Sequence, residues 1–262
     1  MNTPEHVAHP LLTLSVALLF AAIFLFGGRA AYRPGQKGYR RFLSFAAGIS
    51  VAYTFVHVLP ALGAIQDLQT EHPTGFYRLF PEYSVYLWTM AGFLIFSGLE
   101  TMAARSRGAP ENSPDHGRDP ASWQRWVHLG GFAGYAWVLT YFMVWTGKGF
   151  LAVGVFAVAM GVHLIPITCG LREHYQAVYN RSGAFLLAIS CLAGWVCGET
   201  LSIPRPILFN LVAIVAGGVI VNTAIAELPK ERDASYWSFL TGATAYTALL
   251  LTLSHFEKGG RP

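Results

Sequence analysis

Long apolar runs alternate with short polar segments along the whole chain. Eight of these runs are each close to the length of a membrane-spanning helix, which needs about 20 apolar residues. They cover residues 10–26, 42–65, 83–104, 127–144, 150–170, 182–201, 207–228 and 236–253. The pattern predicts an all-α polytopic membrane protein, a bundle of eight transmembrane helices in a single domain over residues 1–262. The composition agrees, since only 12% of the residues are charged, about half the usual share of a soluble domain.

The first apolar run resembles a signal peptide in length, but no Lys or Arg precedes it and a basic cluster follows it. That order is typical of a stop-transfer segment, so we expect the run to remain as the first span. A chain without a cleavable leader suits a bacterial inner (plasma) membrane.

Basic residues predict the orientation of the spans. With the N-terminus outside, the inner loops hold thirteen basic residues: Arg29, Arg33, Lys37, Arg40, Arg41, Arg105, Arg107, Arg118, Arg125, Arg172, Arg181, Lys230 and Arg232. The outer segments hold five: Arg78, Lys148, Arg205, Lys258 and Arg261. We therefore expect both termini to lie outside the cytoplasm. Residues 106–122, rich in Pro, Gly, Asp and Ser, predict a disordered inner loop. The net charge of +4 is spread between apolar segments and not over one face, so it does not indicate nucleic-acid binding.

A short pattern occurs twice. In the second run an Ala-Gly pair ends at Gly48 and a Leu-Pro pair ends twelve residues later at Pro60; in the seventh run the same pairs end at Gly217 and Pro229. The two runs cross the membrane in opposite directions. This combination predicts an inverted repeat, with spans one to three and six to eight around spans four and five, an architecture common in secondary transporters.

Two histidines stand at membrane depth, where an ionisable side chain is costly. His57 and His163 each lie three residues before a proline, Pro60 and Pro166. A proline opens the helix near such a histidine, and a freed carbonyl beside an imidazole can bind a cation. The alternative is a neutral histidine bonded to a nearby carbonyl, with the proline serving packing, and the sequence leaves both open. Glu227 lies near the inner end of span seven.

Other ionisable residues have simpler explanations in the sequence. Glu100 lies at the inner end of span three and Glu199 near the outer end of span six, where water can solvate them. His128, at the start of span four, is expected at the membrane interface.

Three segments resemble the ZIP family of metal transporters. FAAGISVAYTFVHVLPAL in span two is similar to that family's second helix, with its His-x-x-Pro ending. AGFLIFSGLE in span three and AGGVIVNTAIAELPKE in span seven are similar to the third and seventh helices. The resemblance implies eight spans, outward termini and an inner loop after span three.

The chain departs from the family in spans four and five, which carry the metal ligands. His163 and Pro166 match, but Leu164 and Ile167 stand where further ligands are usual, and residues 130–143 contain no His, Asn, Asp or Glu. A divalent ion such as zinc usually needs four ligands. We therefore expect the family's binuclear centre to be absent.

The resemblance implies a membrane transporter that moves a divalent metal cation, zinc or a similar ion, by alternating access with a reduced site. Its metal-binding residues would be His163 as the main ligand, His57 as a gate ligand and Glu227 as an aid to release on the inner side. The ion is the substrate, and no cofactor is expected to stay bound. The alternative is a transport-inactive ZIP-fold protein that acts as a regulatory or assembly partner. No two ionisable groups stand at a catalytic spacing, so an enzyme is not expected. The expected partners are the lipid bilayer and the metal ion; a homodimer stays open.

Overall fold

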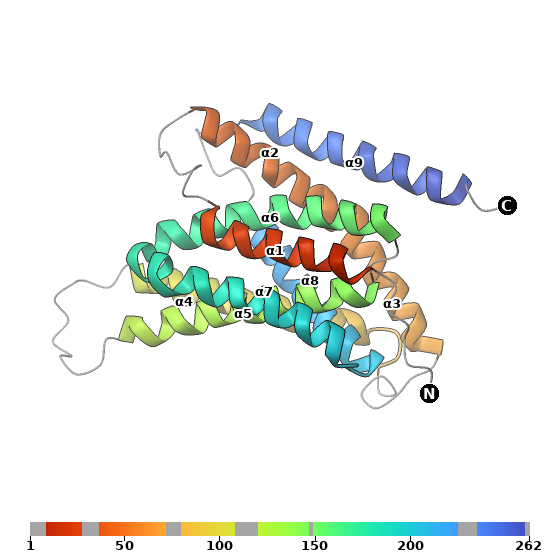
Figure 1. Ribbon diagram of the computed structural model, residues 1–262, viewed down its shortest axis with the longest axis horizontal. Helices are drawn as coiled ribbons and strands as arrows, with labels where there is room; N and C mark the ends of the chain where they lie inside the picture. The colour runs from red at the N-terminus through yellow and green to blue at the C-terminus, as the bar shows by residue number, and fades with distance from the viewer. Residues whose placement is uncertain are drawn as a thin grey trace.

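The computed structural model of the chain describes residues 9–27, 37–71, 80–107, 120–146, 149–224 and 235–259. These residues form helices, with no strand among them (Figure 1). The α-helices are α1 (Pro10–Phe26), α2 (Lys37–Tyr53), α3 (Leu59–Glu71), α4 (Ser84–Arg107), α5 (Pro120–Thr146), α6 (Gly149–Val178), α7 (Ala184–Thr200), α8 (Arg205–Asn222) and α9 (Tyr236–Gly259). Two π-helical segments, η1 (Thr54–Val58) and η3 (Tyr179–Gly183), join α2 to α3 and α6 to α7.

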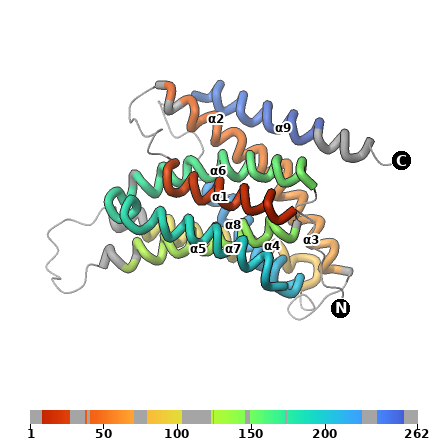
Figure 2. Tube along the Cα trace, viewed as in Figure 1, coloured from red at the N-terminus to blue at the C-terminus, as the bar shows by residue number. Residues whose placement is uncertain are grey.

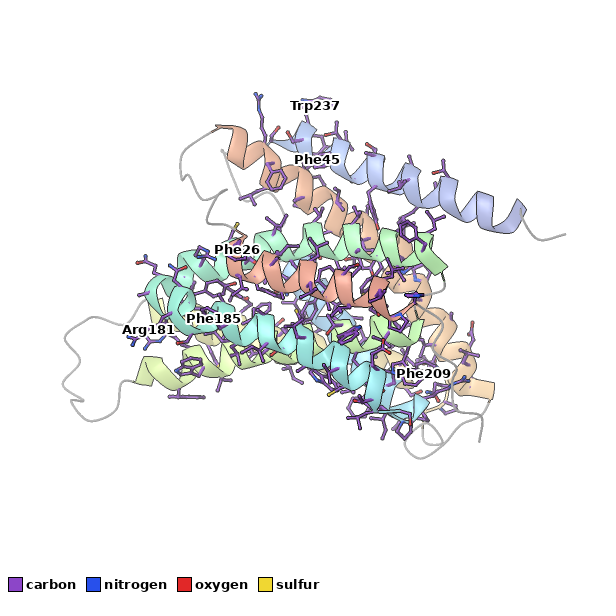
Figure 3. The ribbon with its side chains drawn as sticks, in the orientation of Figure 1. Phe26, Phe45, Arg181, Phe185, Phe209 and Trp237 are labelled. Carbon is purple, nitrogen blue, oxygen red and sulfur yellow. The ribbon has the colours of Figure 1, made fainter. Side chains whose placement is uncertain are left out.

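Six helical rods within the described residues are long and apolar enough to cross a membrane: Arg41–Thr70, Ser84–Met102, Arg125–Trp145, Gly149–Arg172, His174–Thr200 and Arg205–Asn222. Large apolar side chains also cover the outside of the bundle, among them Phe26, Phe185 and Trp237, which Figure 3 labels. These three residues are 61%, 55% and 74% exposed. An exposed surface of this kind suits contact with lipid. The chain is therefore a polytopic helical membrane protein.

The bundle has two ends, and each is named after a connection between helices that lies there. The "α4–α5 end" is where α1, α4 and α6 finish and α5 and α7 begin; the "α5–α6 end" is where α5 and α7 finish and α6 and α8 begin. Figures 1 and 2 show the helices running between these two ends, with α2 and α9 side by side along one edge. The core lies around α5 and α6, where Tyr135, Leu164 and Leu187 are buried.

Among the described residues, glycines bring the backbones of three helix pairs into contact, α4–α8, α2–α9 and α5–α7, and the first two of these pairs match each other. In the pair α4 and α8, a Cβ added at Gly217 would lie 2.1 Å from the carbonyl oxygen of Thr89 and 2.5 Å from the nitrogen of Phe93. A Cβ added at Gly92 would lie 2.0 Å from the carbonyl oxygen of Ile214. Small residues let transmembrane helices approach this closely. Neither position has room for any other residue.

The pair α2 and α9 repeats these contacts atom for atom. A Cβ added at Gly48 would lie 2.1 Å from the carbonyl oxygen of Phe239 and 2.7 Å from the nitrogen of Ala243, and one at Gly242 would lie 2.1 Å from the carbonyl oxygen of Phe45. On α2 and α8, equivalent residues are 169 positions apart in sequence; on α4 and α9 they are 150 apart. The same two offsets relate every residue in these glycine contacts.

The rod formed by α2 and α3 changes its helical form just before Pro60. Proline has no N–H, so it cannot bond to the carbonyl of Val56, and the chain adopts the π-helical segment η1 over Thr54–Val58. His57 lies in this segment. At the other His-x-x-Pro sequence the expected opening does not occur, because α6 keeps helical dihedral angles through Pro166. Its one non-helical residue is Gln176, at φ 34° and ψ −103°.

Most of the disordered loop predicted at about residues 106–122 lies outside the described part of the chain, at residues 108–119. Helix α4 continues to Arg107 and α5 begins at Pro120, so the five residues at the two edges of the predicted loop are helical. Pro120 suits the first position of a helix, where its missing N–H costs nothing.

Candidate functional site

His163 is fully buried in the centre of the bundle, with no exposed surface. Its Nδ1 lies 3.1 Å from the hydroxyl of Ser50 on α2, and its ring lies 6.4 Å, centroid to centroid, from the ring of Tyr135 on α5. A buried imidazole needs such partners, because an unsatisfied polar group in lipid surroundings costs several kcal/mol. His163 therefore joins three helices, α2, α5 and α6, through polar and aromatic contacts.

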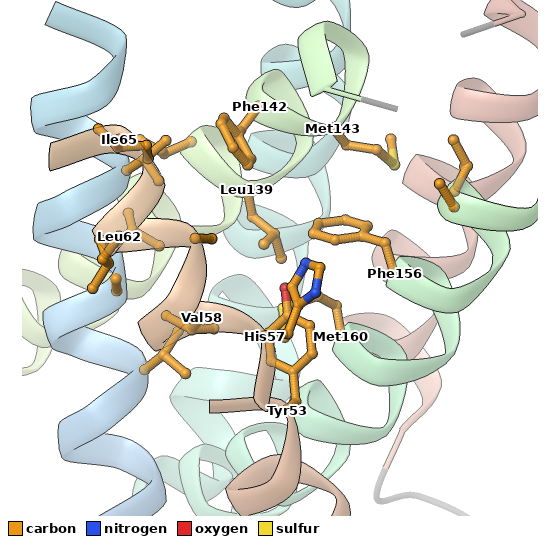
Figure 4. A pocket seen from close by; sticks show the side chains of 18 residues that line it. Tyr53, His57, Val58, Leu62, Ile65, Leu139, Phe142, Met143, Phe156 and Met160 are labelled. Atoms are coloured by element: carbon orange, nitrogen blue, oxygen red, sulfur yellow. The ribbon is translucent and has the colours of Figure 1, made fainter. Parts of the chain in front are cut away.

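A cavity of about 320 Å³ lies between α2–η1–α3, α5, α6 and α8, on the side of His163 that faces the α5–α6 end (Figure 4). Eighteen residues line it, and nearly all are aliphatic or aromatic. The polar exceptions are Tyr53 and His57, whose rings stack with centroids 5.1 Å apart and an interplanar angle of 27°. In Figure 4 the imidazole of His57 lies beside Met160 and Phe156. The cavity is thus an apolar chamber with one imidazole in its wall.

Each of the four helices supplies one lining residue closest to the α4–α5 end, and these form the floor of the cavity: Tyr53, Val138, Met160 and Val219. One helical turn below each floor residue stands a polar side chain, and together these make what we call the polar layer: Ser50, Tyr135, His163 and Asn222. The offset is three residues on every helix, and its sign follows the direction in which each helix runs. All four side chains are at most 1% exposed. The cavity therefore ends on a buried polar layer.

Two hydrogen bonds made by Thr54 lie next to the polar layer. The hydroxyls of Thr54 and Thr223 lie 3.4 Å apart, and the Thr54 hydroxyl donates to the carbonyl of Ser50 at 2.9 Å. The Nδ2 of Asn222 has no hydrogen-bond partner among the described residues. A buried amide without a partner costs about 1–3 kcal/mol, so this donor needs an explanation beyond packing.

Of the three residues predicted to bind metal, the structure describes His163 and His57, and these two lie at different levels of the bundle. His163 lies in the polar layer, whereas His57 lies in the cavity wall, seven residues along the helix from Ser50 and thus about 10 Å away along its axis. Glu227 lies outside the described residues. Among the described residues, no group of three or more His, Cys, Asp or Glu side chains is placed to hold a metal ion.

Sequence reasoning missed Ser50, Tyr135 and Asn222. Small polar residues and tyrosines in apolar runs are usually explained by helix packing, and only the three-residue register against the cavity floor distinguishes these three. The repeat gives a signal only for two neighbours of this layer, because Thr54 and Thr223 stand at the same 169-residue offset as Gly48 and Gly217.

His128, which was expected at the membrane interface, is packed between helices at the start of α5. The residue is 4% exposed and its ring hydrogen-bonds to Glu100 on α4 and Tyr175 on α6. These contacts between helices cannot be read from a single segment of the sequence.

The fold and the site define a class, a polytopic helical membrane protein with a buried polar layer at the base of an apolar cavity. A scan against models of protein families finds no match to the chain, and a search among curated proteins finds none either.

Proposed function

We propose that the protein is a ZIP-like transporter that moves a divalent metal cation, zinc or a similar ion, by alternating access. The observation that carries this proposal is the polar layer beneath the cavity floor, with His163 buried at its centre. An ionisable side chain in the middle of a membrane bundle marks a functional site by default. His163 is the main ligand, His57 acts in the cavity on the way to it, and Glu227 aids release at the far end.

The glycine contacts support an inverted repeat of spans one to three and six to eight, in a bundle of eight spans. Related residues make the same contacts in the pairs α2–α9 and α8–α4. Thr54 and Thr223, also related by the 169-residue offset, meet at 3.4 Å. Equivalent residues of a two-fold repeat meet only on its axis, so the axis runs between these two hydroxyls. The polar layer surrounds that axis, which is where inverted-repeat transporters bind their substrates.

The ligand atoms of the polar layer are an imidazole nitrogen and neutral oxygens. Ser50 and Tyr135 offer hydroxyls, and Asn222 offers an amide oxygen. None is a carboxylate, so the layer leaves the charge of a divalent ion uncompensated and holds it weakly. Weak binding suits an ion that must leave as readily as it arrives. We further propose that the cavity mouth and both termini lie outside the cytoplasm in a bacterial inner membrane, which the excess of basic residues on the predicted inner loops supports.

Metal uptake into proteoliposomes tests the proposal. Zinc, cadmium, iron, manganese and cobalt are screened with the full chain and with His163→Ala and Asn222→Leu. Because Asn222 Nδ2 has no partner among the described residues, Asn222→Leu costs little stability yet removes a ligand oxygen. Both variants should lose at least tenfold in uptake. The matched control is Cys169→Ala, a buried change six residues from His163 on the same helix, which should keep normal uptake.

The apolar lining of the cavity favours a second candidate function. A hydrated ion gains nothing from side chains such as Leu139, Phe156 and Val215, so the chain could keep the fold as a regulatory or assembly partner without ion flux. Uptake equal to that of empty liposomes for every metal, from protein shown to be folded, would select this function and reject the first.

A further inference from the structure

Three ionisable side chains from three helices form a hydrogen-bonded chain at the α4–α5 end. His128 on α5 lies in the middle: its Nε2 is 3.2 Å from Oε1 of Glu100 on α4, and its Nδ1 is 2.6 Å from the hydroxyl of Tyr175 on α6. The His128 side chain is 5% exposed and that of Glu100 is 27% exposed. This Glu-His-Tyr chain plays no part in the polar layer or the cavity.

We propose that Glu100 and His128 bind a divalent transition-metal ion such as zinc, and that Tyr175 positions the imidazole. This inference deepens the proposed function, on which it rests, because it places a second ion-binding site at the end of the bundle opposite the cavity. Imidazole and carboxylate are both common zinc ligands.

The separation of the two ligand atoms suits a bound ion. Zinc bonds to imidazole nitrogen and carboxylate oxygen at about 2.0–2.2 Å, so two of its tetrahedral ligands lie roughly 3.4 Å apart. Nε2 of His128 and Oε1 of Glu100 are already 3.2 Å apart. The distance between the two ligand atoms is therefore close to that in a zinc site, and an ion requires the Glu100 carboxylate to move sideways from the line of the hydrogen bond.

The other side of the imidazole is held as a metal ligand requires. Histidines that bind metal donate their second ring N–H to an oxygen, which fixes the tautomer and the ring orientation. With an ion on Nε2, the Nδ1–H of His128 donates to the hydroxyl oxygen of Tyr175, 2.6 Å away. The ring of Phe132 packs edge-on against the same imidazole, at 5.1 Å and 80°. Both contacts hold the ring plane in place.

The exposure of the three side chains indicates how an ion reaches the site, and the number of protein ligands indicates how many positions stay open to water. Glu100 is the most exposed of the three side chains that form the chain, so an ion arrives or leaves past its carboxylate. Two protein ligands leave two positions for water in a tetrahedral site. Such a site exchanges its ion quickly, as a release site on a transport path must.

Zinc binding to the purified full chain in detergent tests the proposal without any transport step. All measurements use a His163→Gln background, so that zinc at the polar layer does not contribute, and the probe is Zn²⁺ alone in equilibrium dialysis. Adding His128→Gln or Glu100→Gln should weaken zinc binding at least tenfold. Adding Tyr175→Phe should weaken it by about tenfold or more, as the loss of an outer hydrogen bond does at other metal sites.

The matched control is His174→Gln, which removes a neighbouring imidazole that contacts the ring of Tyr175 and leaves both proposed ligands in place. It should bind zinc with unchanged affinity. Should His128→Gln not fold, Glu100→Gln still tests the site, since that carboxylate is partly exposed. Equal zinc affinity in the background protein and in folded Glu100→Gln or His128→Gln overturns the proposal, whatever the uptake experiment gives. Conversely, uptake by the unchanged full chain equal to that of empty liposomes, with zinc binding at this site intact, counts against the proposed function alone.

Discussion

Replacement of Gly217 by alanine should push α4 and α8 apart. The added Cβ would lie 2.1 Å from the carbonyl oxygen of Thr89 and 2.5 Å from the nitrogen of Phe93, whereas ordinary contacts begin at 3.4 Å. Both neighbours are backbone atoms, so no side chain can rotate away. The helices must separate by about 1 Å at this level, because a packed interior has no spare volume.

Two opposing free energies decide the size of the effect. Alanine stabilises a helix by about 1 kcal/mol relative to glycine, and overpacking costs about 1–3 kcal/mol. The matched control is Gly154→Ala on α6, where an added Cβ meets nothing within 4 Å, so that variant keeps the gain without the cost. Gly217→Ala should therefore have a free energy of unfolding about 1–3 kcal/mol below that of Gly154→Ala.

The assay is reversible unfolding of the purified protein in detergent micelles, followed by helical circular dichroism. The same measurement on Gly48→Ala adds a test of the repeat, because its contacts with Phe239 and Ala243 match those of Gly217 with Thr89 and Phe93. The two losses should agree within about 1 kcal/mol. A Gly217→Ala protein as stable as Gly154→Ala would refute the backbone contact between α4 and α8. Unequal losses at Gly48 and Gly217 would count against the repeat.

Two further substitutions test the cavity and its surroundings. His57→Phe keeps an aromatic ring to stack on Tyr53 but removes both nitrogens. The concentration of metal that gives half-maximal uptake should therefore rise severalfold, while thermal stability stays unchanged. Normal uptake by this variant would show that His57 takes no part in transport. Tyr141→Phe deletes a hydroxyl that donates to the carbonyl of Leu201 at 2.9 Å and accepts from the N–H of Ile203 at 2.8 Å. It should lower the free energy of unfolding by about 1–3 kcal/mol and speed hydrogen exchange at residue 203; unchanged exchange there would show that water replaces the hydroxyl.

Much of the helical framework could be predicted from the sequence, because apolar runs of span length have few alternatives in a membrane. The run predicted at residues 10–26 matches α1 residue for residue. The twelve-residue spacing from Gly48 to Pro60 also marked two real features of this helical rod. Gly48 makes a backbone contact with α9, and Pro60 lies two residues after the end of η1. At Pro166 the same reasoning failed, because α6 keeps helical dihedral angles through the proline.

The candidate site was less predictable, because it depends on the register between helices. His163 could be selected by its cost at membrane depth. Ser50 and Asn222 could not, since a serine or asparagine in one run has no visible partner on another. The Glu100–His128 pair shows the same limit: 28 residues and a loop separate two side chains that lie 3.2 Å apart.

The packing around α5 and α6 indicates how the proposed transport cycle would proceed. If spans one to three and six to eight form a repeat, the contact of α5 with α7 corresponds to that of α6 with α1. The first is tight, since a Cβ added at Gly194 would lie 2.2 Å from the carbonyl oxygen of Trp137. The contact of α6 with α1 is looser. A Cβ added at Gly161 would meet only side-chain atoms of α1, the nearest being Ile23 Cδ1 at 3.5 Å. The present conformation is thus asymmetric, with the cavity at the α5–α6 end. Exchange of the two packing modes would close that cavity and open the α4–α5 end, where the proposed site at Glu100 and His128 would take the ion from the polar layer.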